Sequence, residues 1–258
     1  MMVLRPSARA TSLTERNAWV YFRLWYMFVS GFAEPIFYLL SIGVGVGKLI
    51  GGVQFHGDVI PYAHFVAPGM MASAAMNGAI FDSTFSIFFK LKYMKLYDAI
   101  VTTPVTSTEI ATGELLWSLF RCGAYALSFL VAMTCLGFVQ SWWAVAALPS
   151  AILIGFAFSA AGMALTSFMR GWRDFDFINL SLIPLFLFSA TFNPLSVYPR
   201  GLQLVVQLSP LYHGAALIRA CTLGQPSAEM IVHVLYLVLV GAVGLVVTGR
   251  RLERLLLT

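Results

Sequence analysis

Five glycines and a lysine lie within the stretch IGVGVGKLIGG, residues 42–52. Glycine-rich loops that end in lysine bind phosphate, because their backbone N–H groups surround the anion. The phosphate loop of ATPases needs Gly, four residues and then Gly-Lys-Ser/Thr, but here Ile42 stands at the first glycine position and Leu49 follows Lys48. A dinucleotide-binding GxGxxG fails as well, since its last position holds Lys48 or Ile50. The stretch therefore predicts no nucleotide site.

The same glycines have a second pattern. Gly43, Gly47 and Gly51 form two overlapping GxxxG steps. Small residues at this spacing let two helix backbones approach closely in lipid. We expect a helix-packing face here, and the alternative is that glycine is simply frequent in membrane helices.

Candidate catalytic groups are sparse. The four histidines show no metal-ligand spacing, and none of the three cysteines forms a CxxC. Ser209 and His213 could form a hydrolase pair, but no GxSxG sequence accompanies them. Asp174 and Asp176 are a close acidic pair, although two arginines in the same short segment favour a solvated turn. We therefore expect no catalytic, cofactor or metal site, and a membrane-embedded enzyme acting on lipid-linked substrates is an alternative function.

Composition decides the class of protein. Of the 258 residues, 59% are hydrophobic and 10% are charged, and the mean hydropathy is +0.83. Soluble domains carry about 25% charged residues. We expect an all-α integral membrane protein with a single transmembrane domain over residues 1–258. The net charge of +5 then indicates basic residues on the cytoplasmic face rather than a nucleic-acid partner.

Six segments are long and apolar enough, or nearly so, to cross a membrane, which takes about 20 residues. They are residues 32–49, 62–81, 115–138, 142–169, 177–192 and 230–248. Pro184 predicts a kink in the fifth. With a cytoplasmic N-terminus, twelve of the 16 Lys and Arg lie on inner segments and three on outer ones. This bias supports six spans with both termini inside the cell.

Two further segments are expected to lie along the membrane surface. Residues 12–28 begin with capping-box spacing and repeat aromatic residues at helical steps, which predicts an amphipathic helix. The alternative is a cytoplasmic extension of the first span. Residues 193–225 mix prolines with apolar patches and predict short re-entrant or surface-lying helices on the outer side.

The longest inner loop covers residues 89–114. A short helix is expected over residues 92–100, before Pro104. Thr106 and Glu109 have capping-box spacing and predict the start of the helix that enters the third span.

Four ionisable residues at the edges of the spans or inside them form a candidate ion-pair network: Glu34, Asp82, Glu114 and Arg121. A guanidinium in a membrane span needs a partner or water. Glu114 or Asp82 could serve Arg121. The alternatives are a structural ion pair or a snorkelling arginine and, for Glu34, a carboxylate that stabilises a helix start.

Several segments of the sequence resemble those of a known family. EPIFYLLSIGVGVG (34–47), the stretch from FVAPGMM to TGELLW (65–117), FSATFNPLSVYP (188–199) and LSPLYHGAALIRACTLG (208–224) are similar to segments of type-2 ATP-binding-cassette (ABC) exporter permeases. The similarity runs nearly end to end. The subgroup it resembles most exports nodulation factors, lipooligosaccharides and daunorubicin-type drugs.

The resemblance implies a permease without its own ATPase, in a bacterial inner membrane. A separate nucleotide-binding subunit would carry ATP and Mg²⁺, and a second permease copy or a related permease would enclose the pathway. The substrate would be amphipathic, such as a lipid-linked glycan, a lipooligosaccharide or a drug-like molecule, and only the resemblance indicates export. Residues 12–28 would be the interface helix. The coupling surface facing the ATPase would consist of Lys92, Tyr93, Lys95, Leu96, Tyr97, Asp98, Ala99 and Ile100. A scaffold subunit is the other alternative.

Overall fold

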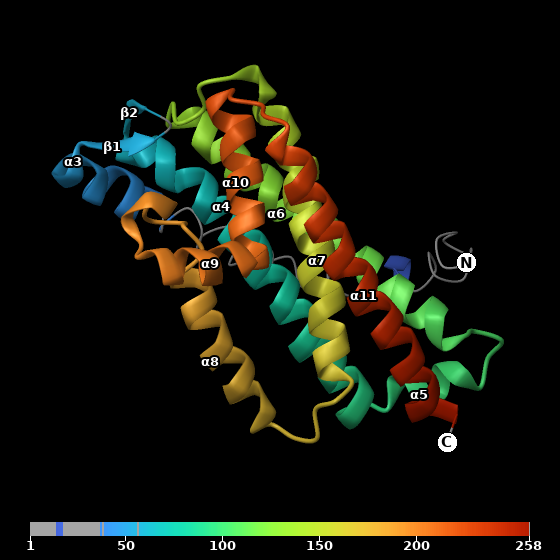
Figure 1. The fold of residues 1–258 in the computed structure, drawn as a ribbon. Coiled ribbons are helices and arrows are strands. Elements are labelled where there is room, and N and C mark those ends of the chain that lie inside the picture. The colour runs from blue at the N-terminus through green and yellow to red at the C-terminus, as the bar shows by residue number, and fades with distance from the viewer. Residues whose placement is uncertain (1–13, 18–36, 38, 56, 258) are drawn as a thin grey trace.

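The computed structural model describes residues 14–17, 37, 39–55 and 57–257, and these form a bundle of helices with one small hairpin (Figure 1). In chain order the elements are η1 (Leu39–Val46), α3 (Gly47–Ile50), β1 (Gly52–Phe55), β2 (Asp58–Pro61), α4 (Tyr62–Phe81), η2 (Asp82–Ser86), η3 (Phe89–Tyr93), α5 (Leu96–Val101), α6 (Ser107–Cys135), η4 (Trp142–Ala146), α7 (Ala147–Thr166), α8 (Asp174–Leu187), η5 (Leu195–Val197), α9 (Arg200–Leu208), α10 (Pro210–Leu223) and α11 (Glu229–Leu257).

Three described helices are long and apolar enough to cross a membrane: Ser107–Cys135, Trp142–Thr166 and Glu229–Leu255. They correspond to the expected third, fourth and sixth spans. The expected second span coincides with α4. The expected fifth span is α8, whose 14 residues reach about 21 Å, short of a hydrocarbon core of about 30 Å. Part of the first lies outside the described residues, so the count of six remains a prediction.

The expectation of an all-α chain was wrong in one place. Strands β1 and β2 form an antiparallel hairpin that pairs Gly52 with Pro61 and Phe55 with Asp58. Gly57 lies between the strands with φ of +92°, a conformation that glycine adopts without a Cβ clash. Strands of four residues are too short for alternation of polar and apolar residues to reveal them in a glycine-rich sequence.

The glycine stretch is helical over residues 39–50 and forms no phosphate loop. A Cβ at Gly47 would lie 3.7 Å from the Cβ of Ala63 on α4, an ordinary packing distance. Gly51 instead ends α3 with φ of +77°, and a Cβ added there would have no atom within 4 Å. No contact is described for Gly43. Gly47 therefore packs on α4, and the packing role of Gly43 stays a prediction.

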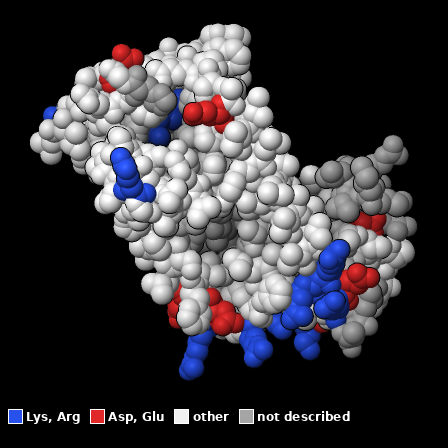
Figure 2. Space-filling view, viewed as in Figure 1, with Lys and Arg blue, Asp and Glu red and all other residues white. Residues whose placement is uncertain are grey.

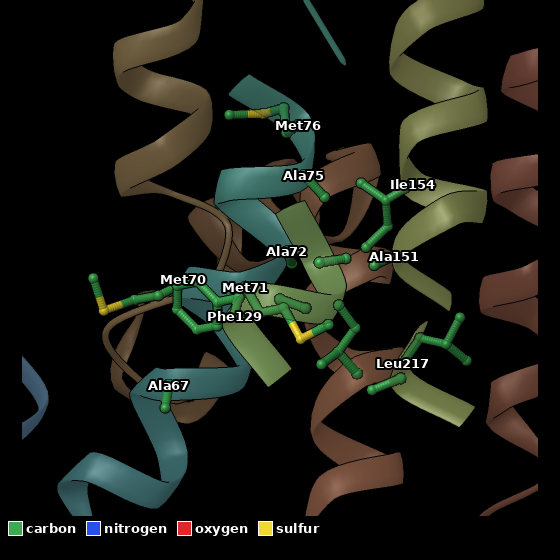
Figure 3. Packing of buried hydrophobic residues seen from close by; sticks show 14 of the residues in the cluster. Ala67, Met70, Met71, Ala72, Ala75, Met76, Phe129, Ala151, Ile154 and Leu217 are labelled. Atoms are coloured by element: carbon green, nitrogen blue, oxygen red, sulfur yellow. The ribbon is translucent and has the colours of Figure 1, made fainter. Parts of the chain in front are cut away.

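The core lies where α4, α7 and α10 meet, with α6 closing one side. Figure 3 shows methionine and alanine side chains of α4 beside Phe129 of α6 and Ile154 of α7. Ala72 and Ala151 are fully buried and bring the helix backbones close together. Dense packing of small residues suits helices in lipid, where association depends on van der Waals contact.

Helix α11 packs against α7 through a glycine that the sequence analysis did not single out. A Cβ at Gly244 would lie 2.6 Å from the carbonyl carbon of Ala160 and 2.8 Å from its oxygen, so the two backbones touch. We expect Gly244→Ala to lower the free energy of unfolding by about 1–3 kcal/mol, because α11 must move away from α7. Thermal unfolding in detergent measures this.

Gly201→Ala is the matched control for that substitution. Gly201 lies in α9 and has no atom within 4 Å of its added Cβ, so the change should stay within about 0.5 kcal/mol. Equal stability of the two variants would show that the α7–α11 contact is loose.

Candidate functional site

The segment between α4 and α6 holds the residues expected to form the coupling surface, and its shape differs from the expected one. The single helix predicted over residues 92–100 is divided into η3, which ends at Tyr93, and α5, which begins at Leu96. Lys95 between them has φ of +46°. A non-glycine residue in the left-handed region breaks a helix, so the chain turns here and α5 takes a new direction.

The exposed side of this segment is formed by Lys92, Tyr93, Lys95, Asp98 and Ala99, with Leu96 and Ile100 partly exposed. Tyr97 differs from the other residues of the expected ATPase-facing set. Its side chain is 1% exposed and points into the bundle. Any contribution of Tyr97 to a partner surface would therefore be indirect.

The capping box predicted at the start of α6 is confirmed. The backbone N–H of Glu109 donates to the Thr106 hydroxyl, and the Thr106 N–H donates to the Glu109 carboxylate at 2.8 Å. Such reciprocal bonds satisfy two free donors of the first turn. They fix where α6 begins and hence where its buried charges lie.

The first buried charge is Glu114, which is 5% exposed. Lys90 Nζ donates to Glu114 Oε2 at 2.7 Å, and Asn17 Nδ2 donates to the same oxygen at 3.2 Å. Thr14 also donates to the backbone oxygen of Gly113 at 3.2 Å. Glu114 on α6 is thus connected to Asn17 and to η3 through Lys90.

The second buried charge is Arg121, also on α6. Its Nη1 pairs with Asp82 Oδ1, and its Nη2 donates to the Tyr125 hydroxyl at 3.0 Å. The expected network is therefore two pairs: Arg121 uses Asp82, while Glu114 uses Lys90. Lys90 was expected only as one of the inner basic charges and not as a partner of Glu114. The remaining candidate, Glu34, lies outside the described residues.

An aromatic cluster also connects the segment of η2 and η3 with the loop before α8. Phe88 is buried, with ring centroids 5.1 Å from Phe175 and 6.0 Å from Trp172. Tyr93 lies 5.7 Å from Trp172. The loop before α8 is thereby held against η2 and η3, next to the coupling segment. The run of aromatic residues from 81 to 93 was the available sequence signal.

Charge is concentrated at the same end of the molecule. Figure 2 shows Lys and Arg gathered near α5 and the C-terminus. The segments at this end carry Lys90, Lys92, Lys95, Arg170, Arg173, Arg250, Arg251 and Arg254. These residues are among those expected on the inner segments, and the orientation of this end in the membrane stays a prediction.

The residues considered for hydrolysis are engaged elsewhere. Ser209 bonds Ser189 through their hydroxyls at 2.8 Å, and His213 bonds other partners. Asp174 accepts backbone N–H bonds from Arg170 and Gly171, which lower the pKa of its carboxyl. This carboxylate stabilises a turn.

His213 instead connects α9, α10 and α11. Its Nε2 lies 2.9 Å from the carbonyl oxygen of Gln207, so Nε2 carries a proton, and its Nδ1 lies 2.7 Å from Nδ1 of His233 on α11. Neutral His213 must then accept from the Nδ1–H of His233. Burial, followed by the neighbouring His233, lowers the pKa of His213.

This arrangement predicts a pH dependence. Because the packed state binds fewer protons at His213 than the opened state, stability is complete above the ordinary histidine pKa and falls as the pH drops below about 6.5. Hydrogen exchange of α10 amides should be faster at about pH 5.5 than at about pH 7.5, after correction for intrinsic rates. His213→Asn should reduce the difference, and the remainder should come from His233, the histidine bonded to it. Equal protection of the wild type at both pH values would contradict the prediction.

Comparison with known proteins agrees with this architecture. Residues 9–223 match the family model described as ABC-2 type transporter. Nodulation protein J of Rhizobium leguminosarum bv. viciae is 29% identical over 227 residues, covering 86% of each chain. Nodulation protein J of Sinorhizobium fredii is 30% identical over 240 residues, covering 88% of this chain and 90% of the relative. With its apolar helices and a match over most of its length, the chain belongs to the ABC-2 type transporter family.

Proposed function

We propose that this chain is the permease subunit of an ATP-driven exporter and that a separate ABC ATPase docks on its inner face. The observation that supports this most is the coupling segment. It presents Lys92, Lys95, Asp98 and Ala99 to the outside, while Tyr97 beside them is buried against the bundle. A short exposed helix with a buried anchor suits the transfer of a partner's movement into the membrane domain.

A second permease copy is part of the proposal. None of the residues of α8 is buried, and Phe177, Leu180 and Ile183 are each more than half exposed. Figure 1 shows α8 at the edge of the bundle. This apolar face supports pairing across α8, where two copies or two related permeases would enclose a pathway.

The proposed cargo is amphipathic, and the permease provides shape and apolar surface for it. The groups weighed for catalysis, Ser209, His213 and Asp174, are bonded within the fold. A lipid-linked glycan, a lipooligosaccharide or a drug-like molecule fits a pathway between apolar helices. The basic end that holds α5 supports a cytoplasmic position for this end and for both termini, in a bacterial inner membrane.

Co-expression with an ABC ATPase encoded in the same genome tests the proposal. The complex should survive purification in mild detergent and hydrolyse ATP after reconstitution in lipid nanodiscs. Inverted vesicles should then take up an amphipathic dye only when ATP is supplied. If no ATPase associates under conditions that preserve the complex, the transporter loses its energy source and the enzyme and scaffold functions must be reconsidered.

A further inference from the structure

The buried side of the coupling segment meets the Glu114 carboxylate. Tyr97 is almost completely buried, and its hydroxyl forms no hydrogen bond of ordinary geometry with the described residues. Burial, then the charge of Glu114 and a weak hydrogen-bonding contact with that carboxylate, raise the pKa of this hydroxyl well above its usual value. A buried polar group without a well-formed bond needs an explanation.

Glu114 is already held from two other sides. Lys90 and Asn17 both donate to Oε2, so the described bonds to this carboxylate end on one oxygen. A cavity of about 10 Å³ lies between Tyr97, Glu114 and Thr166, which is space for about one water molecule. Tyr97 therefore has both a nearby acceptor and room to move.

Helix α6 can carry such a movement across the molecule. It is continuous from Ser107 to Cys135, and the 21 residues from Glu114 to its end span about 32 Å. The Thr106 capping box and the Arg121–Asp82 pair fix the helix on either side of Glu114. A displacement of Glu114 would therefore move α6 as a rigid body.

We propose that Glu114 is a positioning residue through which displacement of α5 by the ATPase is passed to α6, with Tyr97 and Lys90 exchanging as donors to its carboxylate. In the arrangement described here Lys90 and Asn17 hold Glu114. When the ATPase moves α5, the Tyr97 hydroxyl completes a hydrogen bond to Glu114, and α6 shifts with it. The inference rests on the proposed docking of an ATPase at α5.

Cys135 provides a natural reporter for this movement. It is exposed at the far end of α6, whereas Cys122 and Cys221 are buried. A spin label on Cys135 can be followed in nanodiscs while the bound ATPase is switched between ADP and ATP, using a hydrolysis-deficient ATPase. The wild-type complex should show a nucleotide-dependent change in the label spectrum.

Glu114→Gln and Tyr97→Phe should each reduce the amplitude of this spectral change by about fivefold or more. Fivefold is the lower end of the usual range for coupling between two sites. The ATPase should still co-purify with both variants. Glu109→Gln is the matched control, because glutamine also serves in a capping box and Glu109 lies on the same helix. It should keep the full signal.

The outcomes separate the two proposals. A full signal in both Glu114→Gln and Tyr97→Phe overturns the role of Glu114 and leaves ATPase docking intact. A wild-type chain that binds no ATPase, or shows no nucleotide-dependent signal, overturns the proposed function and this inference with it. If Glu114→Gln fails to fold, Tyr97→Phe decides, since it removes one hydroxyl that makes no well-formed bond.

Discussion

Replacement of Arg121 by methionine is expected to lower the free energy of unfolding by about 3–5 kcal/mol, the usual cost of leaving one charge of a buried ion pair without its partner. Both side chains are largely buried, with 12% of Arg121 and 8% of Asp82 exposed. The substitution removes the ion pair and also the bond to Tyr125. Denaturation in mixed detergent micelles, followed by tryptophan fluorescence, measures the loss.

The double variant Arg121→Met, Asp82→Leu is the decisive control. Replacing both partners by apolar residues of similar volume is often neutral or stabilising, because no desolvated charge remains. We therefore expect the double variant to regain most of the stability that Arg121→Met loses. If the single variant lowers the free energy of unfolding by less than about 1 kcal/mol, the value typical of exposed pairs, then Asp82 is hydrated and the ion pair is not buried.

This pair also shows what the sequence could predict. Asp82 and Arg121 were identified because charges within apolar segments are rare and need partners. The choice between Asp82 and Glu114 as partner of Arg121 stayed open. It depends on how α4 and α6 pack, and residues 39 positions apart in the chain leave no periodic signal of that contact.

Local signals were reliable where one short motif decides the structure. The capping box at Thr106 and the bounds of α4 follow from residue types within a few positions. The coupling segment is different. Local helical preference favoured one helix over residues 92–100. The π-helical turn at η3 and the left-handed Lys95 interrupt it, because tertiary packing can override local preference.

The inward position of Tyr97 illustrates the same limit. A mixed segment of lysines, tyrosines and apolar residues indicates a surface for a partner, but it does not indicate which tyrosine anchors the helix. Tyr93 is exposed and Tyr97 is buried. The turn at Lys95, with φ of +46°, lies between the two tyrosines and separates η3 from α5. The partner surface and the internal contact are therefore two sides of one segment.

A large charged side chain on the exposed side of α5 should therefore weaken ATPase docking without affecting the folding of the permease. Ala99 is exposed and lies two residues after the buried Tyr97. We expect Ala99→Arg to weaken binding of the ATPase subunit by about 30-fold or more, equivalent to at least about 2 kcal/mol, as for changes at the centre of an interface. Binding of the purified ATPase to the permease in nanodiscs, measured by biolayer interferometry, gives this ratio.

Ala228→Arg is the matched control, because Ala228 is an exposed alanine just before α11, at the opposite end of the molecule from α5. It introduces the same side chain and should leave ATPase binding unchanged. Both variants should unfold at the wild-type temperature, since neither alanine is buried. If Ala99→Arg binds the ATPase as tightly as Ala228→Arg does, α5 lies outside the interface. The docking site would then have to be sought on the neighbouring loop around Trp172, which shares the aromatic cluster with η3.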